Sequence, residues 1–144
     1  MEERISWEEY ALLLARTAAL RSEDVYWKVG ACALNSQKMV LGLGYNGLAS
    51  GKNVAAAFWK DRDERRKYMI HAEVNCLSLF KRDEAEILAV TTLPCSSCAA
   101  MIVSYGIKRV IYEEDYKRDD VALEIFKFYK IEFKKINIRN KRLT

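Results

Sequence analysis

ILAVTTLPCSSCAAMIVSYGIKRVIY, residues 87–112, predicts a strand, a helix and a second strand. Residues 87–92 and 107–112 have the length and the β-branched content of strands. Residues 95–105 predict a helix, and Gly106 follows at a position where glycine commonly ends one. Strands that alternate with helices in this way indicate an α/β fold.

The flanking sequence continues the same alternation on both sides. Ser6 is a candidate N-cap, with Glu8 and Glu9 in the first turn, for a helix that runs to about Ser22. Two apolar runs around the polar turn 35–38 predict a hairpin. The predicted elements are, in chain order, helix 6–22, strands 29–34 and 39–45, helix 71–81, strand 87–92, helix 95–105, strand 107–112, helix 119–129 and strand 131–136. We expect a three-layer α/β/α sandwich around a mixed five-stranded sheet.

Length and composition indicate one domain over residues 1–144. The 144 residues are 51% hydrophobic and 31% charged, which is typical of a globular protein. Six glycines and one proline exclude collagen-like and proline-rich classes. Residues 47–69 predict a long loop with some helix, and loops of this length in compact domains usually serve a function.

The formal net charge of +4 is concentrated at the C-terminus. The segment from residue 134 onward holds five basic side chains and no acidic one, and it leaves 19 basic against 20 acidic residues before it. We expect a basic, flexible tail there, and a body without the basic groove that a nucleic acid would need.

The start of the chain, Met1-Glu2-Glu3-Arg4, differs from a basic signal-peptide start, and no apolar stretch is long enough to span a membrane. We therefore expect a cytoplasmic protein. In a reducing compartment, its four cysteines are more often metal ligands or catalytic groups than disulfides.

Two short segments carry the chemistry, His71-Ala72-Glu73 and Pro94-Cys95-Ser96-Ser97-Cys98. Cys95 and Cys98 lie three residues apart at the start of a predicted helix, so both sulfurs face the same side, where the helix dipole favours thiolate. His71, the one histidine, adds a third ligand at another predicted helix start. Three protein ligands leave a fourth tetrahedral position for water, as in catalytic zinc sites, and Glu73 is then near enough for proton transfer.

Each segment alone has simpler explanations. The two cysteines are also compatible with a redox pair, or with half of a structural zinc site completed by Cys32 or Cys76. Cys32 lies in an apolar strand and Cys76 inside a predicted helix, positions where small buried thiols commonly pack. Together, however, the two segments form the signature of zinc deaminases.

On these segments the chain resembles the cytidine/deoxycytidylate deaminase superfamily, and within it the deoxycytidylate (dCMP) deaminases. The resemblance extends from Trp7 to about Phe133. It includes further matches at Lys28-Val29-Gly30-Ala31-Cys32, Gly44-Tyr45-Asn46-Gly47, Tyr68 to Asn75, Gly106-Ile107-Lys108 and Tyr116.

The resemblance implies a cytidine-deaminase-like fold and hydrolytic deamination of dCMP to dUMP and ammonia. It implies His71, Cys95 and Cys98 as ligands of zinc and Glu73 as the group that moves protons. Asn46 would contact the sugar, the Ala72 backbone the base, and Lys28 and Tyr116 the phosphate.

Residues 47–70 contain neither Cys nor His, so we expect one zinc per chain without the second, structural zinc that some relatives bind. The resemblance also implies a homo-oligomer, commonly a hexamer, with dCTP and dTTP as effectors. Three alternatives stay open: dCTP as the substrate, a base in tRNA or single-stranded nucleic acid as the substrate, and a zinc-containing nucleotide-sensing module without catalysis.

Overall fold

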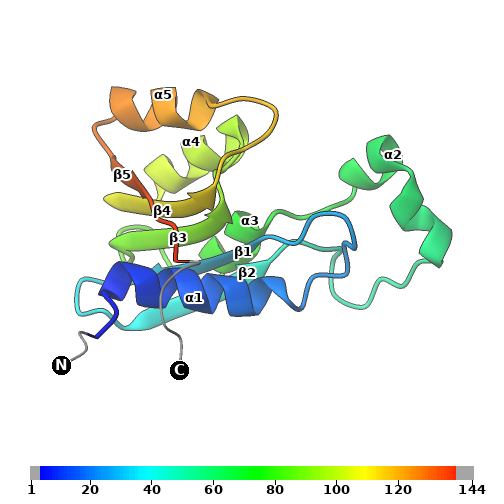
Figure 1. Cartoon of the computed structure of the whole chain (residues 1–144), viewed down its shortest axis with the longest axis horizontal. Helices are drawn as coiled ribbons and strands as arrows, with labels where there is room; N and C mark the ends of the chain where they lie inside the picture. The colour runs from blue at the N-terminus through cyan, green and yellow to red at the C-terminus, as the bar shows by residue number, and fades with distance from the viewer. Residues whose placement is uncertain (1–3, 139–144) are drawn as a thin grey trace.

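The predicted three-layer α/β/α architecture is confirmed. The computed structural model describes residues 4–138 and contains a five-stranded sheet in the order β2-β1-β3-β4-β5 (Figure 1). Its strands are β1 (Gly30–Leu34), β2 (Val40–Tyr45), β3 (Ile87–Thr92), β4 (Arg109–Glu114) and β5 (Glu132–Lys135). The helices are α1 (Trp7–Ala19), η1 (Ala56–Lys60), α2 (Arg62–Arg66), α3 (Ala72–Leu77), α4 (Ser96–Ser104) and α5 (Val121–Phe128), where η1 is a 3-10 helix.

The sheet is mixed, as expected. Strand β1 runs antiparallel to both β2 and β3, whereas β3, β4 and β5 run parallel to one another. Parallel neighbours need a crossover connection, and α4 and α5 supply it between β3 and β4 and between β4 and β5. The carboxyl ends of β3 and β4 therefore meet at one edge of the sheet, directly before α4 begins.

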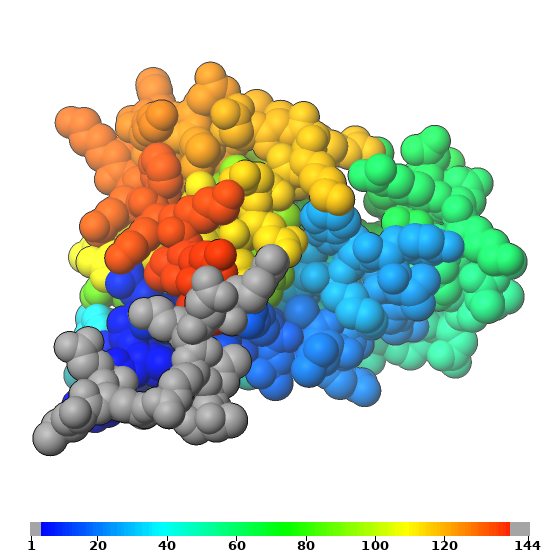
Figure 2. Space-filling model, viewed as in Figure 1, coloured from blue at the N-terminus to red at the C-terminus, as the bar shows by residue number. Residues whose placement is uncertain are grey.

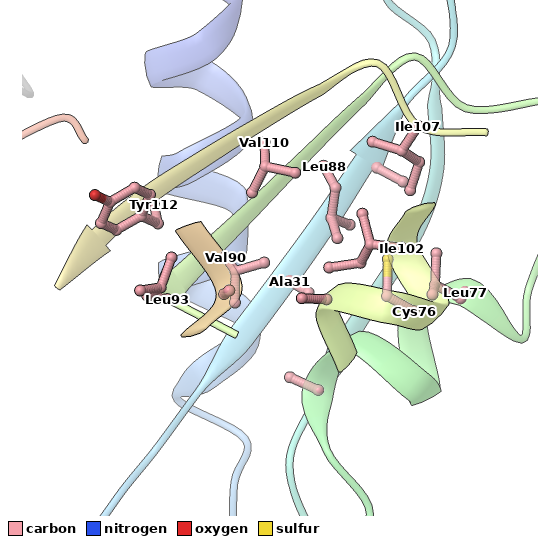
Figure 3. Close-up of a cluster of buried hydrophobic side chains, with 14 of the residues drawn as sticks. Ala31, Cys76, Leu77, Leu88, Val90, Leu93, Ile102, Ile107, Val110 and Tyr112 are labelled. Atoms are coloured by element: carbon pink, nitrogen blue, oxygen red, sulfur yellow. The ribbon is translucent and has the colours of Figure 1, made fainter. Parts of the chain in front are cut away.

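Alternate residues of the central strands build two separate cores. In β1, Cys32 and Leu34 face α1, whereas Ala31 and Ala33 face the opposite layer of α3, α4 and α5. Figure 3 shows the second core, in which Leu88, Val90, Val110 and Tyr112 of β3 and β4 pack with Ile102 of α4 and Leu77 of α3. Every residue of β1 and β3 is therefore buried, and neither strand alternates apolar with charged residues.

The C-terminal segment belongs partly to the fold. Lys134 and Lys135 lie in β5, and Ile138 is fully buried in the core under α1. The remainder of the expected basic tail, residues 139–144, lies outside the described residues. Within residues 4–138, no helix is both long and apolar enough to cross a membrane.

Two helices are shorter than predicted because their last turns tighten into i→i−3 hydrogen bonds. Helix α1 ends at Ala19 rather than about Ser22, and the Ser22 hydroxyl instead donates to the Asn46 carbonyl. Helix α3 ends at Leu77 rather than residue 81, and the Ser78 hydroxyl donates to the Asn75 carbonyl. The Ser78 hydroxyl thus takes a carbonyl of its own helix, whereas the Ser22 hydroxyl bonds to a different segment.

Glycine at position 30 permits the close approach of α1 to the sheet. A Cβ atom added there would lie 1.8 Å from the Ala15 carbonyl oxygen, which is backbone and cannot rotate away. Gly44 plays the same part for α3, because a Cβ there would lie 2.5 Å from the Ala72 carbonyl oxygen. These two glycines therefore set the distance between the sheet and the helix on each face.

We expect Gly30→Ala to lower the free energy of unfolding by about 3 kcal/mol, because α1 must move to accept the methyl group. Urea unfolding of the variant beside the wild type measures this change. Gly47→Ala is the matched control, because the nearest atom to its added Cβ is a Glu23 carboxylate oxygen 3.8 Å away. Equal unfolding midpoints for the two variants would contradict the close-approach explanation.

Candidate metal centre

Two helices begin side by side at the carboxyl edge of the sheet and bring the three predicted ligands together. His71 is the N-cap residue of α3 and Cys95 that of α4, while Cys98 lies in the first turn of α4. The end of β3 is held in place because the Leu93 amide donates to the Glu114 carbonyl over 2.8 Å. The ligand atoms of His71, Cys95 and Cys98 all lie within 4.8 Å of one another.

The distances between these atoms fit a tetrahedral zinc site. His71 Nδ1 lies 3.2 Å from Cys98 Sγ and 3.6 Å from Cys95 Sγ. A nitrogen and a sulfur that bind one tetrahedral zinc ion lie roughly 3.5 Å apart, given the usual zinc–ligand distances. One imidazole and two thiols also form a donor set that zinc prefers. No other group of three or more His, Cys, Asp or Glu side chains in residues 4–138 is arranged in this way.

The protonation equilibria of the cluster favour a thiolate. Hydrogen bonding from Cys98, with a further contribution from His71, lowers the pKa of Cys95 to about 4. Cys98 donates to Cys95 and is buried, so its own pKa is raised. The hydrogen bond to Cys95 likewise raises the pKa of His71. A divalent cation at this position would replace these shared protons, as metal binding to thiols generally does.

Glu73 lies in the first turn of α3 with only 4% of its surface exposed. Burial raises the pKa of its carboxyl group to about 7, and the charges of His71 and Cys95 also act on it. A buried carboxyl with a pKa near neutrality can both accept and release a proton at physiological pH. The structure thus places an acid–base group beside the three candidate ligands.

Asn46 lies close to this centre because the backbone on either side of it is fixed. The amide groups of Gly47 and Ile70 exchange hydrogen bonds with each other's carbonyls over 3.0 and 2.7 Å, which places Asn46 and His71 next to one bridge. The Asn75 side chain of α3 donates to the Tyr45 carbonyl over 2.8 Å. The turn that carries Asn46 is therefore attached to the start of α3.

The other predicted substrate contacts occupy different places. Ala72, fully buried, is the first residue of α3 and follows His71 directly. Tyr116 lines a cavity of about 390 Å³ together with Leu93, which lies two residues before Cys95. Lys28 lines a different cavity of about 340 Å³ with Arg16 of α1, and its ammonium group donates to the Ser22 carbonyl. Their contacts with a substrate stay predictions.

Cys32 and Cys76 take no part in the cluster. Both are fully buried, Cys32 under α1 and Cys76 on the opposite face, and burial raises the pKa of the Cys32 thiol to about 12. Burial raises the pKa of Cys76 as well, and its thiol donates to the Gly42 carbonyl. Trp59, which lies in the predicted long loop 47–69, is also buried, and its ring packs edge to face on the Phe58 ring.

Residues 5–114 match the family model described as the cytidine and deoxycytidylate deaminase zinc-binding region. The chain belongs to this family. The deoxycytidylate deaminase of Homo sapiens is 32% identical over 127 residues, which cover 82% of this chain and 70% of the human protein. The matched region is a zinc-binding one, which agrees with the placement of His71, Cys95 and Cys98 as candidate ligands.

Two solved structures show the same fold. The dCMP deaminase of the cyanophage S-TIM5 in its apo form has a TM-score of 0.76 and 23% identity, covering 93% of this chain and all of that one. Its complex with dCMP and dUMP has a TM-score of 0.68 and 24% identity, covering 90% and 93%.

Sequence reasoning did not find three residues that join separate segments near Asn46: Asp24, Trp27 and Arg65. Arg65 belongs to the charged run 60–67, where nothing in the sequence distinguishes it from its exposed neighbours. Asp24 and Arg65 are buried together, and the Trp27 ring packs under the Lys117 ammonium group at 4.7 Å. Only the packing of separate segments reveals these contacts.

We expect the purified wild-type chain to contain one zinc ion, and Cys98→Ser and His71→Ala to contain less than about a tenth of that amount, because each removes one of three ligands. Metal analysis of the dialysed proteins measures the content. Cys32→Ala removes a thiol outside the cluster and serves as the control. Zinc retention by His71→Ala, or zinc loss from Cys32→Ala, would contradict the ligand assignment.

Proposed function

We propose that this chain is a zinc-dependent dCMP deaminase, which converts dCMP and water to dUMP and ammonia. The observation that carries the proposal is the buried Glu73 beside the cluster of His71, Cys95 and Cys98. Membership of the cytidine and deoxycytidylate deaminase family supports it, as does the deoxycytidylate deaminase name of the human relative.

His71, Cys95 and Cys98 would hold the zinc ion, which supplies Lewis-acid activation of water near neutral pH. Glu73 takes a proton from the attacking water and delivers it to N3 of the cytosine ring. Glu73 then transfers the second proton of the water to the amino group, which leaves C4 as ammonia. A pKa of about 7 suits this carboxyl group to both directions of transfer.

The remaining substrate contacts are assigned by resemblance and by position. Asn46 would contact the sugar, and the backbone of Ala72, at the start of α3, would contact the base. Tyr116 would contact the phosphate from the cavity beside Leu93. Lys28 is a second candidate for the phosphate, although its ammonium group donates to the Ser22 carbonyl.

The resemblance also supports a cytoplasmic homo-oligomer, with a hexamer as the expected state, and regulation by dCTP and dTTP. Deamination in nucleic acid is less favoured, since the residues before 134 carry no excess of basic side chains.

Glu73→Gln should lower kcat by about 10²–10⁴-fold and leave the zinc content unchanged, because it removes proton transfer and no ligand. Absorbance near 290 nm follows the loss of cytosine, and metal analysis follows zinc. Glu124→Gln, an exposed change on α5, is the matched control. Loss of zinc from Glu73→Gln would make Glu73 a ligand or a support of the metal site.

A substrate panel tests the proposed reaction itself. We expect dCMP to be deaminated with the highest kcat/KM among dCMP, dCTP, cytidine and single-stranded DNA, and addition of dCTP or dTTP to alter the rate. Faster turnover of dCTP would shift the assignment to the triphosphate. No turnover of any cytosine compound by zinc-loaded protein would favour a nucleotide-sensing module.

A further inference from the structure

Residues 48–69, here called the arm, form an excursion from the sheet whose two ends meet. The backbone bridge between Gly47 and Ile70 closes its base, next to Asn46 on one side and His71 on the other. Figure 1 shows η1 and α2 of the arm at the far end of the molecule from β5. The arm is thus attached at its base to the site but needs a further contact to fix its outer part.

Arg65 of α2 supplies that contact. Its side chain is turned inward and only 7% of the residue is exposed, whereas Arg62 and Arg66 on the same helix are exposed. Its Nη1 donates to the Trp59 carbonyl over 2.6 Å, and its guanidinium lies 4.9 Å from the centre of the Tyr26 ring. Its Nε lies 3.6 Å from a carboxylate oxygen of Asp24.

Asp24 lies in the segment 22–29, here called the 22–29 loop, which connects α1 to β1. The residue is 4% exposed, and its Oδ1 accepts the amide groups of Tyr26 and Trp27 over 2.8 and 3.1 Å. Its other oxygen, Oδ2, faces Arg65. One carboxylate therefore shapes the loop with one oxygen and holds the arm with the other.

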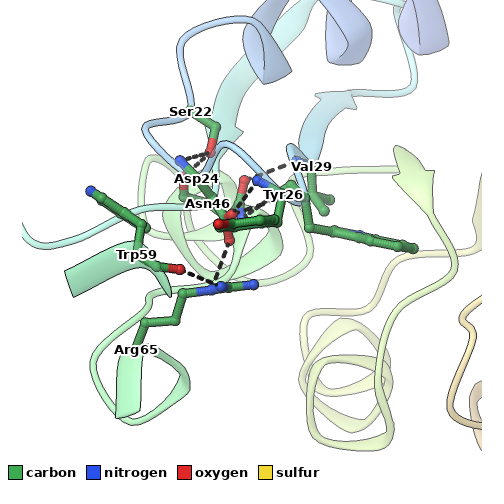
Figure 4. Close-up of polar contacts among 8 residues, drawn as sticks. Ser22, Asp24, Tyr26, Val29, Asn46, Trp59 and Arg65 are labelled. Carbon is green, nitrogen blue, oxygen red and sulfur yellow. Dashed lines mark hydrogen bonds and ion pairs between the residues drawn. The ribbon is translucent and has the colours of Figure 1, made fainter. Parts of the chain in front are cut away.

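The 22–29 loop is in turn bound to Asn46. The Asn46 side chain donates to the Trp27 carbonyl and accepts the Val29 amide, both over 2.8 Å (Figure 4). The Ser22 hydroxyl donates to the Asn46 carbonyl over 2.9 Å. These bonds form a continuous set of contacts from the arm, through Arg65 and Asp24, to the turn beside His71.

A third segment joins this set. The Lys117 ammonium group lies 4.7 Å from the centre of the Trp27 ring, and Lys117 lines the cavity that also contains Leu93 and Tyr116. In Figure 2 the light-blue 22–29 loop lies against the green arm on one side and close to the yellow-orange residues after β4 on the other. The loop therefore contacts both the arm, which ends just before His71, and the segment after β4, which shares a cavity with Leu93.

A buried ion pair is weak support for stability in general, because taking both charges out of water offsets much of their attraction. Such a pair does favour one arrangement of the segments that carry it, since either charge left alone in the interior is strongly unfavourable. Arg65 and Asp24 lie on two segments distant in sequence, and the Arg65 guanidinium also lies over the Tyr26 ring of the 22–29 loop. Their pairing is thus suited to setting how these segments lie relative to each other.

We propose that the Arg65–Asp24 ion pair is a latch that holds the arm and the 22–29 loop in the arrangement required to bind the deoxynucleotide. Arg65 and Asp24 are positioning residues, which act through Asn46 and Trp27 and touch no reacting atom. The role in nucleotide binding rests on the proposed function. Opening the latch weakens substrate binding and leaves the metal ligands and Glu73 in place.

The test breaks the ion pair from each side. Asp24→Asn keeps an oxygen that accepts the Tyr26 and Trp27 amide groups but removes the charge, and Arg65→Met removes the partner while keeping an unbranched side chain. For both variants we expect KM for dCMP to rise about tenfold or more, with kcat within about threefold of the wild type and zinc content unchanged.

Two further variants separate the latch from a general change in charge. Lys67→Met removes an exposed ion pair with Glu64 on the same short helix and should leave KM unchanged. The double variant Asp24→Asn/Arg65→Met should raise KM no further than Arg65→Met alone, because that variant has already lost the ion pair.

Limited trypsin digestion tests whether the ion pair holds the arm, and it needs no measurement of activity. The exposed basic residues of the arm are Lys52, Lys60, Arg62, Arg66 and Lys67. We expect trypsin to cleave at these residues faster in Asp24→Asn than in the wild type, and no faster in Lys67→Met at the sites that both proteins share. Unchanged cleavage of the arm in Asp24→Asn would overturn the latch.

The kinetic outcomes discriminate in the same way. A lower melting temperature with unchanged KM would overturn the positioning role and make the pair a purely structural contact. A fall in kcat together with loss of zinc would overturn it as well, because the pair would then support the metal centre. If the wild type deaminates no cytosine nucleotide, the proposed function fails, and with it the role in nucleotide binding, while the trypsin comparison still decides whether the pair holds the arm.

Discussion

His71 reaches Cys95 and Cys98 because two helices start beside each other where β3 ends, and this convergence governs the rest of the structure. The parallel pairing of β3 with β4 places the start of α4 at that edge. Glycine at position 44 then lets α3 approach β2 closely enough to bring its own first residue alongside. The three candidate ligands project from backbone that is packed on the sheet, so the packing of the two cores also holds the metal centre in place.

The site divides between rigid and irregular parts of the molecule. The metal ligands and Glu73 lie at or near the first turns of helices that are packed on the sheet. The 22–29 loop, by contrast, is joined to the arm and to the residues after β4 by side-chain contacts. Such a division is common in proteins whose loops are carried by a packed scaffold.

The features that sequence reasoning found are those determined over short stretches of chain. The strand 87–92 was predicted with its observed bounds, because its apolar run is bordered by a turn and by Pro94. The donor set follows from local sequence as well, because Cys95 and Cys98 are three residues apart and His71 lies at a helix start. The burial of Asp24 and Arg65 could not be predicted, because it depends on the packing of two segments that are distant in sequence. The ends of α1 and α3 were missed because the last turns tighten into i→i−3 backbone hydrogen bonds, which a periodic pattern does not indicate.

The backbone bridge at the base of the arm has a consequence for how the chain can vary. Since Gly47 and Ile70 are already held together, the length and composition of what lies between them have little effect on the sheet or on the start of α3. The arm is thus an insertion whose two ends meet at one bridge, immediately before the candidate ligand His71. A change of length within the arm can therefore leave the start of α3 and the strands beside it in place.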